Sequence, residues 1–229
     1  MRWSKRTKSY RRRGASTDRR ALTSGDPGSG VEVGSEPRGA VSWWHLKHAA
    51  RVLAGGGVVA YPTEGVFGLG CDPQNAAAVM RVLAIKDRPV EKGLILIASD
   101  RAQLSGYVCP DPLMEQRIVP SWPGPVTWLL PAGPLARPWL TGRSALLAVR
   151  VSAHPVAAAL CRAFGAPIVS TSANLSGKPP ARSALAVRKA LGSHGLDFLV
   201  PGKIGAQSGP TEIRHGRSGA VMRTGTARA

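Results

Sequence analysis

Residues 167–177 read PIVSTSANLSG, a short apolar run followed directly by a cluster of small polar side chains. The apolar run is typical of a buried strand, and the KPP sequence at residues 178–180 can neither continue a strand nor begin a helix at once. We therefore expect the polar side chains on a loop at the end of a strand, where ligands bind in α/β sheets. A turn that is rich in Ser and Asn because these residues favour turns explains this stretch equally well.

The composition fits a globular protein that does not cross a membrane. The chain has 229 residues, of which 43% are hydrophobic, and this length suits one domain with an extension. No apolar run reaches the roughly 18 residues that a membrane span requires. The three cysteines, Cys71, Cys109 and Cys161, form no CxxC pair, which argues against a zinc site or a disulfide scaffold. We expect a cytoplasmic protein whose cysteines are reduced and buried as small hydrophobic residues.

The chain is strongly basic, with 31 Lys and Arg residues against 13 Asp and Glu residues and a net charge of +18. Residues 1–40 carry +6 of this charge, from 10 basic and 4 acidic residues, and the rest of the chain carries +12. Both parts are expected to attract polyanions such as nucleotides or RNA. A generally arginine-rich composition explains the charge without any ligand.

Residues 1–40 are predicted to be a disordered basic extension, because their arginines repel one another and Ser, Gly and Pro dominate after Thr23. No apolar segment follows the charges, so a secretory signal is not expected. The extension is either a tail that attracts RNA or a translation upstream of a start codon near Val41. We favour the second interpretation because ordered sequence begins abruptly there, and we expect the folded domain over residues 41–229.

Alternating secondary structure over the rest of the chain predicts an α/β fold. Arg150 lies in an otherwise apolar strand, so it must find a partner or face a cleft, and we favour the cleft. Helices are expected at 43–54, with Trp44 on its packing side, at 76–85, with Met80 on its core face, and at 156–164 and 183–191. Residues 99–119 are expected to be helical around Leu104, Val108, Leu113 and Ile118. Strands are expected at 58–61, 94–98, 126–130, 146–151, 167–169, 198–200, 210–213 and 220–223.

Two further segments carry candidate site residues. Residues 62–73, PTEGVFGLGCDP, are predicted to be a loop that places Thr63 and Glu64 at a strand end. The helix at 76–85, capped by Asn75, leads into Lys86 and Arg88 before Pro89 stops it. These two cations either complement the helix dipole or form a clamp on phosphate, with the arginine as a planar fork and the lysine as a point charge.

Five segments in this order resemble one known family. They are YPTE at 61–64 with GLGCD at 68–72, KDRP at 86–89, WPGPVT at 122–127, LAVRV at 147–151 and STSANLSG at 170–177. Each segment alone is a weak signal, but the ordered set closely resembles the YrdC-like family in its short bacterial form, over about residues 41–223. The resemblance implies an α/β fold, a YrdC-like twisted mixed sheet with flanking helices around a large basic cavity.

The resemblance also implies a reaction. Such proteins convert L-threonine, bicarbonate or CO2, and ATP with Mg²⁺ into threonylcarbamoyl-AMP and pyrophosphate. Proteins of a tRNA threonylcarbamoyl-transferase complex then pass the group to an adenosine beside the anticodon, so contact with tRNA itself is expected to be weak or indirect. The residues expected to carry the chemistry are Lys86, Arg88, Ser172 and Asn174, and no metal ligand from the chain is expected.

The resemblance also assigns site residues to the two substrates, and three residues of the catalytic set recur on the ATP side. Those expected to hold L-threonine are Thr63, Arg150, Ser170 and Thr211. Those expected on the ATP side are Lys86, Arg88, Val90, Leu146, Ser172, Pro180 and Arg223. The chain departs from longer relatives, since Ile95 or Ile97 stands where they carry a histidine and their second C-terminal domain is absent.

Two other functions fit parts of the sequence. A double-stranded-RNA or tRNA-binding module without chemistry fits the charge, but the basic residues flank strand-end loops instead of forming a strip with exposed aromatic residues. A carbamoyl-transfer domain of the hydrogenase-maturation type has a related fold, but the sequence lacks its zinc-finger and acylphosphatase segments. The synthase reaction is therefore the favoured expectation.

Overall fold

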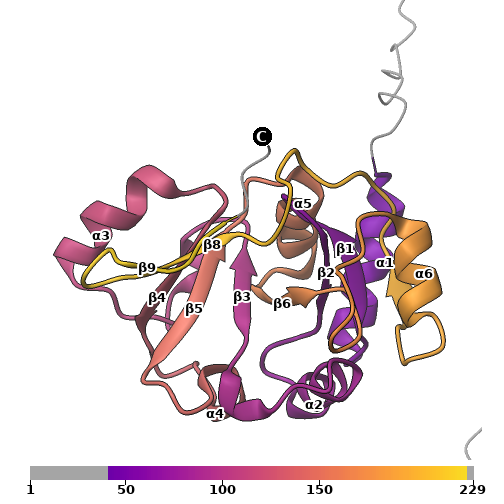
Figure 1. Cartoon of the computed structure of the whole chain (residues 1–229), viewed down its shortest axis with the longest axis horizontal. Coiled ribbons are helices and arrows are strands. Elements are labelled where there is room, and N and C mark those ends of the chain that lie inside the picture. The colour runs from indigo at the N-terminus through magenta and orange to yellow at the C-terminus, as the bar shows by residue number, and fades with distance from the viewer. Residues whose placement is uncertain (1–40, 226–229) are drawn as a thin grey trace, which may run out of the picture. The chain divides into compact units, whose positions relative to one another are not determined.

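Nine strands form one mixed sheet in the part of the chain that the computed structural model describes, residues 41–225 (Figure 1). The predicted basic extension at residues 1–40 lies outside these described residues. The strand order across the sheet is β7-β1-β2-β6-β3-β5-β4-β8-β9. The strands are β1 (Val59–Pro62), β2 (Phe67–Gly70), β3 (Ile95–Ala98), β4 (Val126–Pro131), β5 (Leu146–Val151), β6 (Ile168–Ser172), β7 (Phe198–Leu199), β8 (Glu212–His215) and β9 (Val221–Arg223).

Parallel and antiparallel pairs both occur in the middle of this sheet. Strand β6 pairs antiparallel with β2 on one side and with β3 on the other, and β3 pairs parallel with β5. In this register Ser172 lies opposite Gly68, Ser170 lies opposite Ile95, and Ile97 lies opposite Arg150. The expected mixed sheet is confirmed, and its order makes neighbours of strands that are far apart in the sequence.

Helices cover both faces of the sheet, because residues along the strands alternate between two hydrophobic cores. Tyr61 and Ile97 belong to the core beneath α1 (Trp43–Ala54) and α5 (Pro155–Phe164), which pack against each other (Figure 1). Ala60 and Leu96 belong to the larger core on the other face. The other helices are α2 (Ala76–Ile85), α3 (Pro112–Ile118), α4 (Pro138–Thr141) and α6 (Ala184–Leu191), with short 3₁₀ turns at Val90–Lys92, Ala102–Leu104 and Val119–Ser121.

Local capping explains where the predicted helices begin. The Asn75 side chain accepts a hydrogen bond from the Ala78 N–H at 3.0 Å at the start of α2. Ser183 caps α6 in the same way by accepting from the Ala186 N–H at 3.1 Å. Within residues 41–225 no helix is both long enough and apolar enough to cross a bilayer.

The predicted loop at 62–73 is wrong in its middle, because β2 lies there and pairs antiparallel with β1. All four residues of β2 are buried. Its glycines permit close packing instead of a turn: a Cβ on Gly70 would lie 2.0 Å from the Val169 carbonyl oxygen of β6. Strand β6 likewise extends further than expected, so Ser170, Thr171 and Ser172 lie in the strand.

Several residues expected in the core are exposed. Trp44 and Met80 are 61% and 46% exposed, and Cys109 is exposed whereas Cys71 and Cys161 are buried. Residues 99–118 hold one 3₁₀ turn and the short helix α3, and a second 3₁₀ turn begins at Val119, since Gly106, Pro110 and Pro112 interrupt a longer helix. On α3 Leu113 is 64% exposed, and its neighbour Met114 is 3% exposed.

The two neighbouring residues of α3 provide a matched test of this packing. We expect Met114→Ala to lower the free energy of unfolding by about 2–5 kcal/mol, because it removes a buried side chain and leaves a cavity. Leu113→Ala is expected to change it by less than about 0.5 kcal/mol, because that side chain faces solvent. Urea unfolding of both variants measures the difference, and equal losses would contradict the orientation of α3.

Candidate active site

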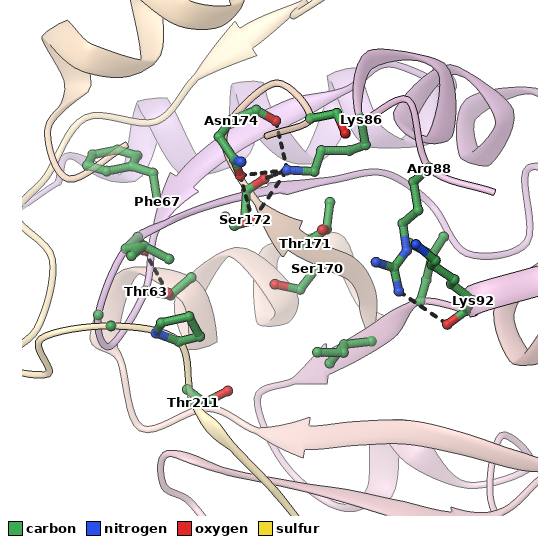
Figure 2. A pocket seen from close by; sticks show the side chains of 18 of the residues that line it. Thr63, Phe67, Lys86, Arg88, Lys92, Ser170, Thr171, Ser172, Asn174 and Thr211 are labelled. Carbon is green, nitrogen blue, oxygen red and sulfur yellow. Dashed lines mark hydrogen bonds between the residues drawn. The ribbon is translucent and has the colours of Figure 1, made fainter. Parts of the chain in front are cut away.

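A cavity of about 320 Å³ lies where β2, β5, β6 and the segment after α2 meet, within the size range of ligand pockets (Figure 2). Strands β2, β6, β3 and β5 are consecutive in the sheet, so side chains from separate parts of the sequence reach one hollow. Nine of the predicted site residues line it: Thr63, Lys86, Arg88, Arg150, Ser170, Ser172, Asn174, Thr211 and Arg223.

The three remaining predicted residues do not line this cavity. Leu146 borders a neighbouring hollow of about 230 Å³, which Arg88 and Arg223 also line. Val90 borders a surface hollow beside the end of α2, and Pro180 is not among the lining residues of the cavity. Their assignment to the ATP side stays a prediction.

Lys86 connects the end of α2 to the end of β6. Its side chain is largely buried, and its Nζ donates to both the backbone and the side-chain oxygens of Ser172 and Asn174 (Figure 2). The Nζ–oxygen distances are 2.7 Å and 3.3 Å for the Ser172 O and Oγ, and 2.7 Å and 2.6 Å for the Asn174 O and Oδ1. Three N–H groups therefore serve four acceptors. The ammonium thereby fixes residues 172–174, which we name the polar turn.

The polar turn is held from its other side as well. The Ser172 hydroxyl donates to Asn174 Oδ1 at 2.6 Å, and Asn174 Nδ2 donates to the Leu175 and Lys178 carbonyls at 2.9 Å and 2.6 Å. Burial lowers the pKa of Lys86 to about 8, with a smaller effect in the same direction from the nearby Arg88 cation. The ammonium is thus closer to losing its proton than an ordinary lysine.

Arg88 is anchored beside the cavity with part of its guanidinium still free. Its Nε and Nη2 donate to the Gly93 carbonyl at 3.1 Å and 2.9 Å, and Nη2 also donates to the Lys92 carbonyl at 3.1 Å. Its Nη1 makes no hydrogen bond to the described residues. Figure 2 shows Arg88 beside Lys92 on one side of the cavity, with Thr63 and Thr211 on the other. A fixed fork with free donors is suited to binding phosphate oxygens.

Arg150 has protein partners and also lines the cavity. The sequence alone presents these as alternatives, and the structure shows both. Its Nη1 donates to the Thr211 and Thr127 hydroxyls at 2.7 Å and 3.3 Å, and its Nη2 lies 3.3 Å from Glu64 Oε2. Burial alone would raise the pKa of the Glu64 carboxyl, but Arg150 and the Ser152 hydroxyl outweigh burial and lower it. Glu64 is therefore an ionised partner at neutral pH.

The cavity lining concentrates positive charge. Its cationic residues are Lys86, Arg88, Lys92, Arg150 and Arg223, against the single carboxylate of Asp87 among the lining residues. The pKa of Arg223 is lowered by burial and by the neighbouring Arg150 and Arg88 cations. Because like charges held close together favour a bound anion, the site suits a ligand that carries several negative charges.

Sequence reasoning missed some residues that shape the site. Glu64 was noted beside Thr63 at a strand end, but its pairing with Arg150 is a contact between residues 86 positions apart that no local signal predicts. Ser152 and Thr127 complete the same buried network. Asp87 lies between the two clamp cations in the sequence and has a φ of 42°, in the left-handed region.

Comparisons with a family model and with known proteins point to the same family. The Sua5/yciO/yrdC family model, described as "Telomere recombination", matches residues 51–225. A protein of Nitrosococcus oceani named threonylcarbamoyl-AMP synthase is 55% identical over 181 residues, which cover 79% of this chain and 97% of that protein.

Two solved structures share the fold. P. abyssi Sua5 complexed with L-threonine superimposes with a TM-score of 0.70 at 31% identity, covering 75% of this chain and 51% of that chain. E. coli YciO superimposes with a TM-score of 0.71 at 26% identity, covering 80% of this chain and 90% of that chain. The chain therefore spans about half of the P. abyssi protein and most of the E. coli one.

The environment of Lys86 makes a measurable prediction. We expect its ε-amino group to titrate near pH 8, because burial and Arg88 both disfavour the ammonium. Side-chain ¹⁵N NMR of the lysines as a function of pH measures the titration, and Lys86→Arg, whose guanidinium does not titrate in this range, should remove that signal. A midpoint above pH 10 for the signal that disappears would contradict the buried placement of Nζ.

Proposed function

Because the chain belongs to the Sua5/yciO/yrdC family, we propose that it makes threonylcarbamoyl-AMP and pyrophosphate from L-threonine, bicarbonate or CO2, and ATP. The observation that carries the proposal is the cavity, in which a lysine-anchored polar turn faces several arginines. The high identity to the Nitrosococcus protein over nearly all of that protein supports the same reaction.

The proposed reaction has two parts. The neutral amine of L-threonine first adds CO2 and releases a proton to solvent to give a carbamate, and a carbamate oxygen then attacks the α-phosphorus of ATP while pyrophosphate leaves. Negative charge develops on phosphate oxygens, so positioning and fixed cations do most of the catalysis. A carbamate is already an anion, so the second part requires no general base.

We assign the nucleotide phosphates to the side of the cavity that holds Arg88. Its guanidinium is fixed by the Gly93 carbonyl and keeps Nη1 available, and Lys92 and Arg223 add charge nearby. Lys86 contributes to the same electrostatic field, while its hydrogen bonds keep Ser172 and Asn174 in place at the reacting end of the nucleotide. This division keeps the predicted Lys86 and Arg88 clamp and gives its two members different tasks.

We assign L-threonine to the side of the cavity that holds Thr63, Arg150 and Thr211, with Ser170 between the two sides. P. abyssi Sua5, which shares this fold, has been crystallised as a complex with L-threonine, and this supports an amino-acid site in the present cavity. The guanidinium of Arg150 suits the carboxylate of the amino acid, and the hydroxyls of Thr63 and Ser170 suit its polar groups.

Magnesium would arrive with ATP. The described residues contain no cluster of three or more side chains able to hold a metal ion, and Asp87 supplies the carboxylate of the cavity lining. This donor set fits Mg²⁺, which commonly binds substrate phosphates with one or two carboxylates and several waters. The ion would neutralise phosphate charge, and the chain itself orients the two substrates.

The product is an activated carbamoyl group, so a second protein must consume it. We propose that proteins of a tRNA threonylcarbamoyl-transferase complex in the cytoplasm take this group to tRNA, and that the chain itself contacts tRNA weakly or indirectly. The alternative of an RNA-binding module without chemistry is not favoured, because a module of that kind does not require a cavity lined by anchored polar side chains.

The proposal is tested by removing the anchored arginine. We expect Arg88→Ala to fold and to lower the rate of threonine-dependent pyrophosphate release by about 30- to 1000-fold, the effect of losing about 2–4 kcal/mol of transition-state stabilisation. The assay contains L-threonine, bicarbonate, Mg²⁺ and labelled ATP without RNA, and it records both pyrophosphate and the AMP adduct.

Arg101→Ala is the matched control, since Arg101 pairs with Glu115 at the exposed surface away from the cavity. It should keep the wild-type rate. A wild-type protein that forms no adduct in this assay would refute the proposed reaction, whereas an active wild type with an equally active Arg88→Ala variant would refute only the phosphate assignment.

A further inference from the structure

Glu64 is the buried carboxylate of the site that the proposed reaction leaves without a task. It does not line the cavity, yet each of its oxygens is engaged. Its backbone carbonyl accepts from the Gln207 N–H at 3.1 Å, its Oε1 accepts from the Ser152 hydroxyl at 2.7 Å, and its Oε2 lies 3.3 Å from Arg150 Nη2. The last contact is an ion pair without the alignment of a hydrogen bond.

The turn that carries Glu64 is in close backbone contact with residues 203–211, which we name the cavity strap. The Gly205 N–H donates to the Thr63 carbonyl at 2.9 Å. A Cβ on Gly65 would lie 2.1 Å from the Gly209 carbonyl oxygen, and a Cβ on Gly205 would lie 2.6 Å from the Glu64 carbonyl oxygen. Only glycine allows the two segments to approach this closely, and the cavity strap ends at Thr211 in the cavity lining.

Arg150 joins both segments through one guanidinium. Nη2 faces Glu64, while Nη1 donates to the hydroxyl of Thr211 at 2.7 Å. Its Nε–H is buried without a hydrogen-bond partner among the described residues, and Nη2 makes only the ion pair with Glu64, so two donors are left over. A planar guanidinium held along one edge keeps its other donors in fixed directions.

The charge balance explains why an acid is needed at this place. Arg150 is only 4% exposed and shares the cavity with Lys86, Arg88, Lys92 and Arg223. A buried cation among like charges is costly unless an opposite charge lies against it. Among the described residues Glu64 is the carboxylate that contacts Arg150, so it keeps the guanidinium in place before any ligand binds.

We propose that Glu64 is a positioning residue for L-threonine: it orients Arg150, and through Arg150 it orients Thr211, toward the carboxylate of the amino acid. The inference rests on the proposed function, because it assigns the threonine side of the cavity. Holding the two groups in their bound arrangement in advance lowers the entropy lost when threonine binds. ATP binding, which uses the Arg88 side, does not depend on Glu64.

Glu64→Gln tests this role because it keeps the shape and an oxygen for Ser152 while removing the charge. We expect it to weaken L-threonine binding about tenfold, the scale of one charge-assisted contact, and to leave the KM for ATP within about twofold. Calorimetry measures threonine binding without ATP, and the adenylation assay measures both KM values. Glu115→Gln is the matched control, since Glu115 also pairs with an arginine, Arg101, but at the surface.

A double-mutant cycle separates positioning from general destabilisation. If Glu64 acts through Arg150, Glu64→Gln should have a much smaller effect on threonine affinity in an Arg150→Gln background than in the wild type. Additive effects, an equal loss for ATP and threonine, or threonine binding that is unchanged or tighter would each overturn the proposal.

A further variant serves in case Glu64→Gln does not fold. Ser152→Ala keeps the charge but releases Oε1, and we expect it to weaken threonine binding about threefold in the same direction, whereas unchanged binding overturns the proposal. A wild type that forms no threonine-dependent AMP adduct refutes the proposed reaction. An active wild type whose Glu64→Gln variant binds threonine normally refutes the role of Glu64 alone.

Discussion

The site depends on one buried ammonium group. Lys86 lies directly after α2, and its Nζ is surrounded by four oxygens of Ser172 and Asn174 at the end of β6. Burial disfavours the charged form of a lysine, and such a group is tolerated only where its donors are satisfied. The end of the helix and the polar turn are therefore held as one unit, and Arg88, two residues later, is placed relative to that turn.

The second constraint is electrostatic. Lys86, Arg88, Lys92, Arg150 and Arg223 line one hollow, in which Asp87 is the acidic lining residue, and the carboxylate of Glu64 behind Arg150 is already paired. Such an arrangement opposes the stability of the unliganded protein and favours any ligand with several negative charges. Strain of this kind is commonly retained at sites where function requires it, and other contacts must offset it. Here the hydrogen bonds of the buried Lys86 ammonium and the ion pair between Arg150 and Glu64 offset the repulsion among the cations.

Local signals predicted most elements but could not predict how they meet. Asn75 caps α2 as expected, and both ends of α1 and α2 agree with the sequence, because capping and the glycines after Ala54 act within a few residues. Strand β2 was missed since its glycines resemble a loop, and the close neighbour that requires glycine at position 70 is the Val169 carbonyl of β6, about a hundred residues later. The order β2-β6-β3-β5 is a non-local property, and it is this order that brings Ser170 and Arg150 to one cavity.

The sequence posed the partner and the cleft as alternatives for Arg150, and the geometry shows why they are compatible. A guanidinium has five N–H donors in one plane, more than Glu64 and two threonine hydroxyls can satisfy. The partners can therefore fix the plane of the group while Nη2, which makes only the ion pair with Glu64, keeps an N–H without a protein acceptor among the described residues; the Nε–H also lacks one but is buried. A lysine at this position would present a point charge that Glu64 could hold, but its rotating donors would not orient Thr211 at the same time. An arginine suits this position in a buried strand because protein partners can hold its guanidinium while the same group binds a ligand. Neither role alone explains the residue as well.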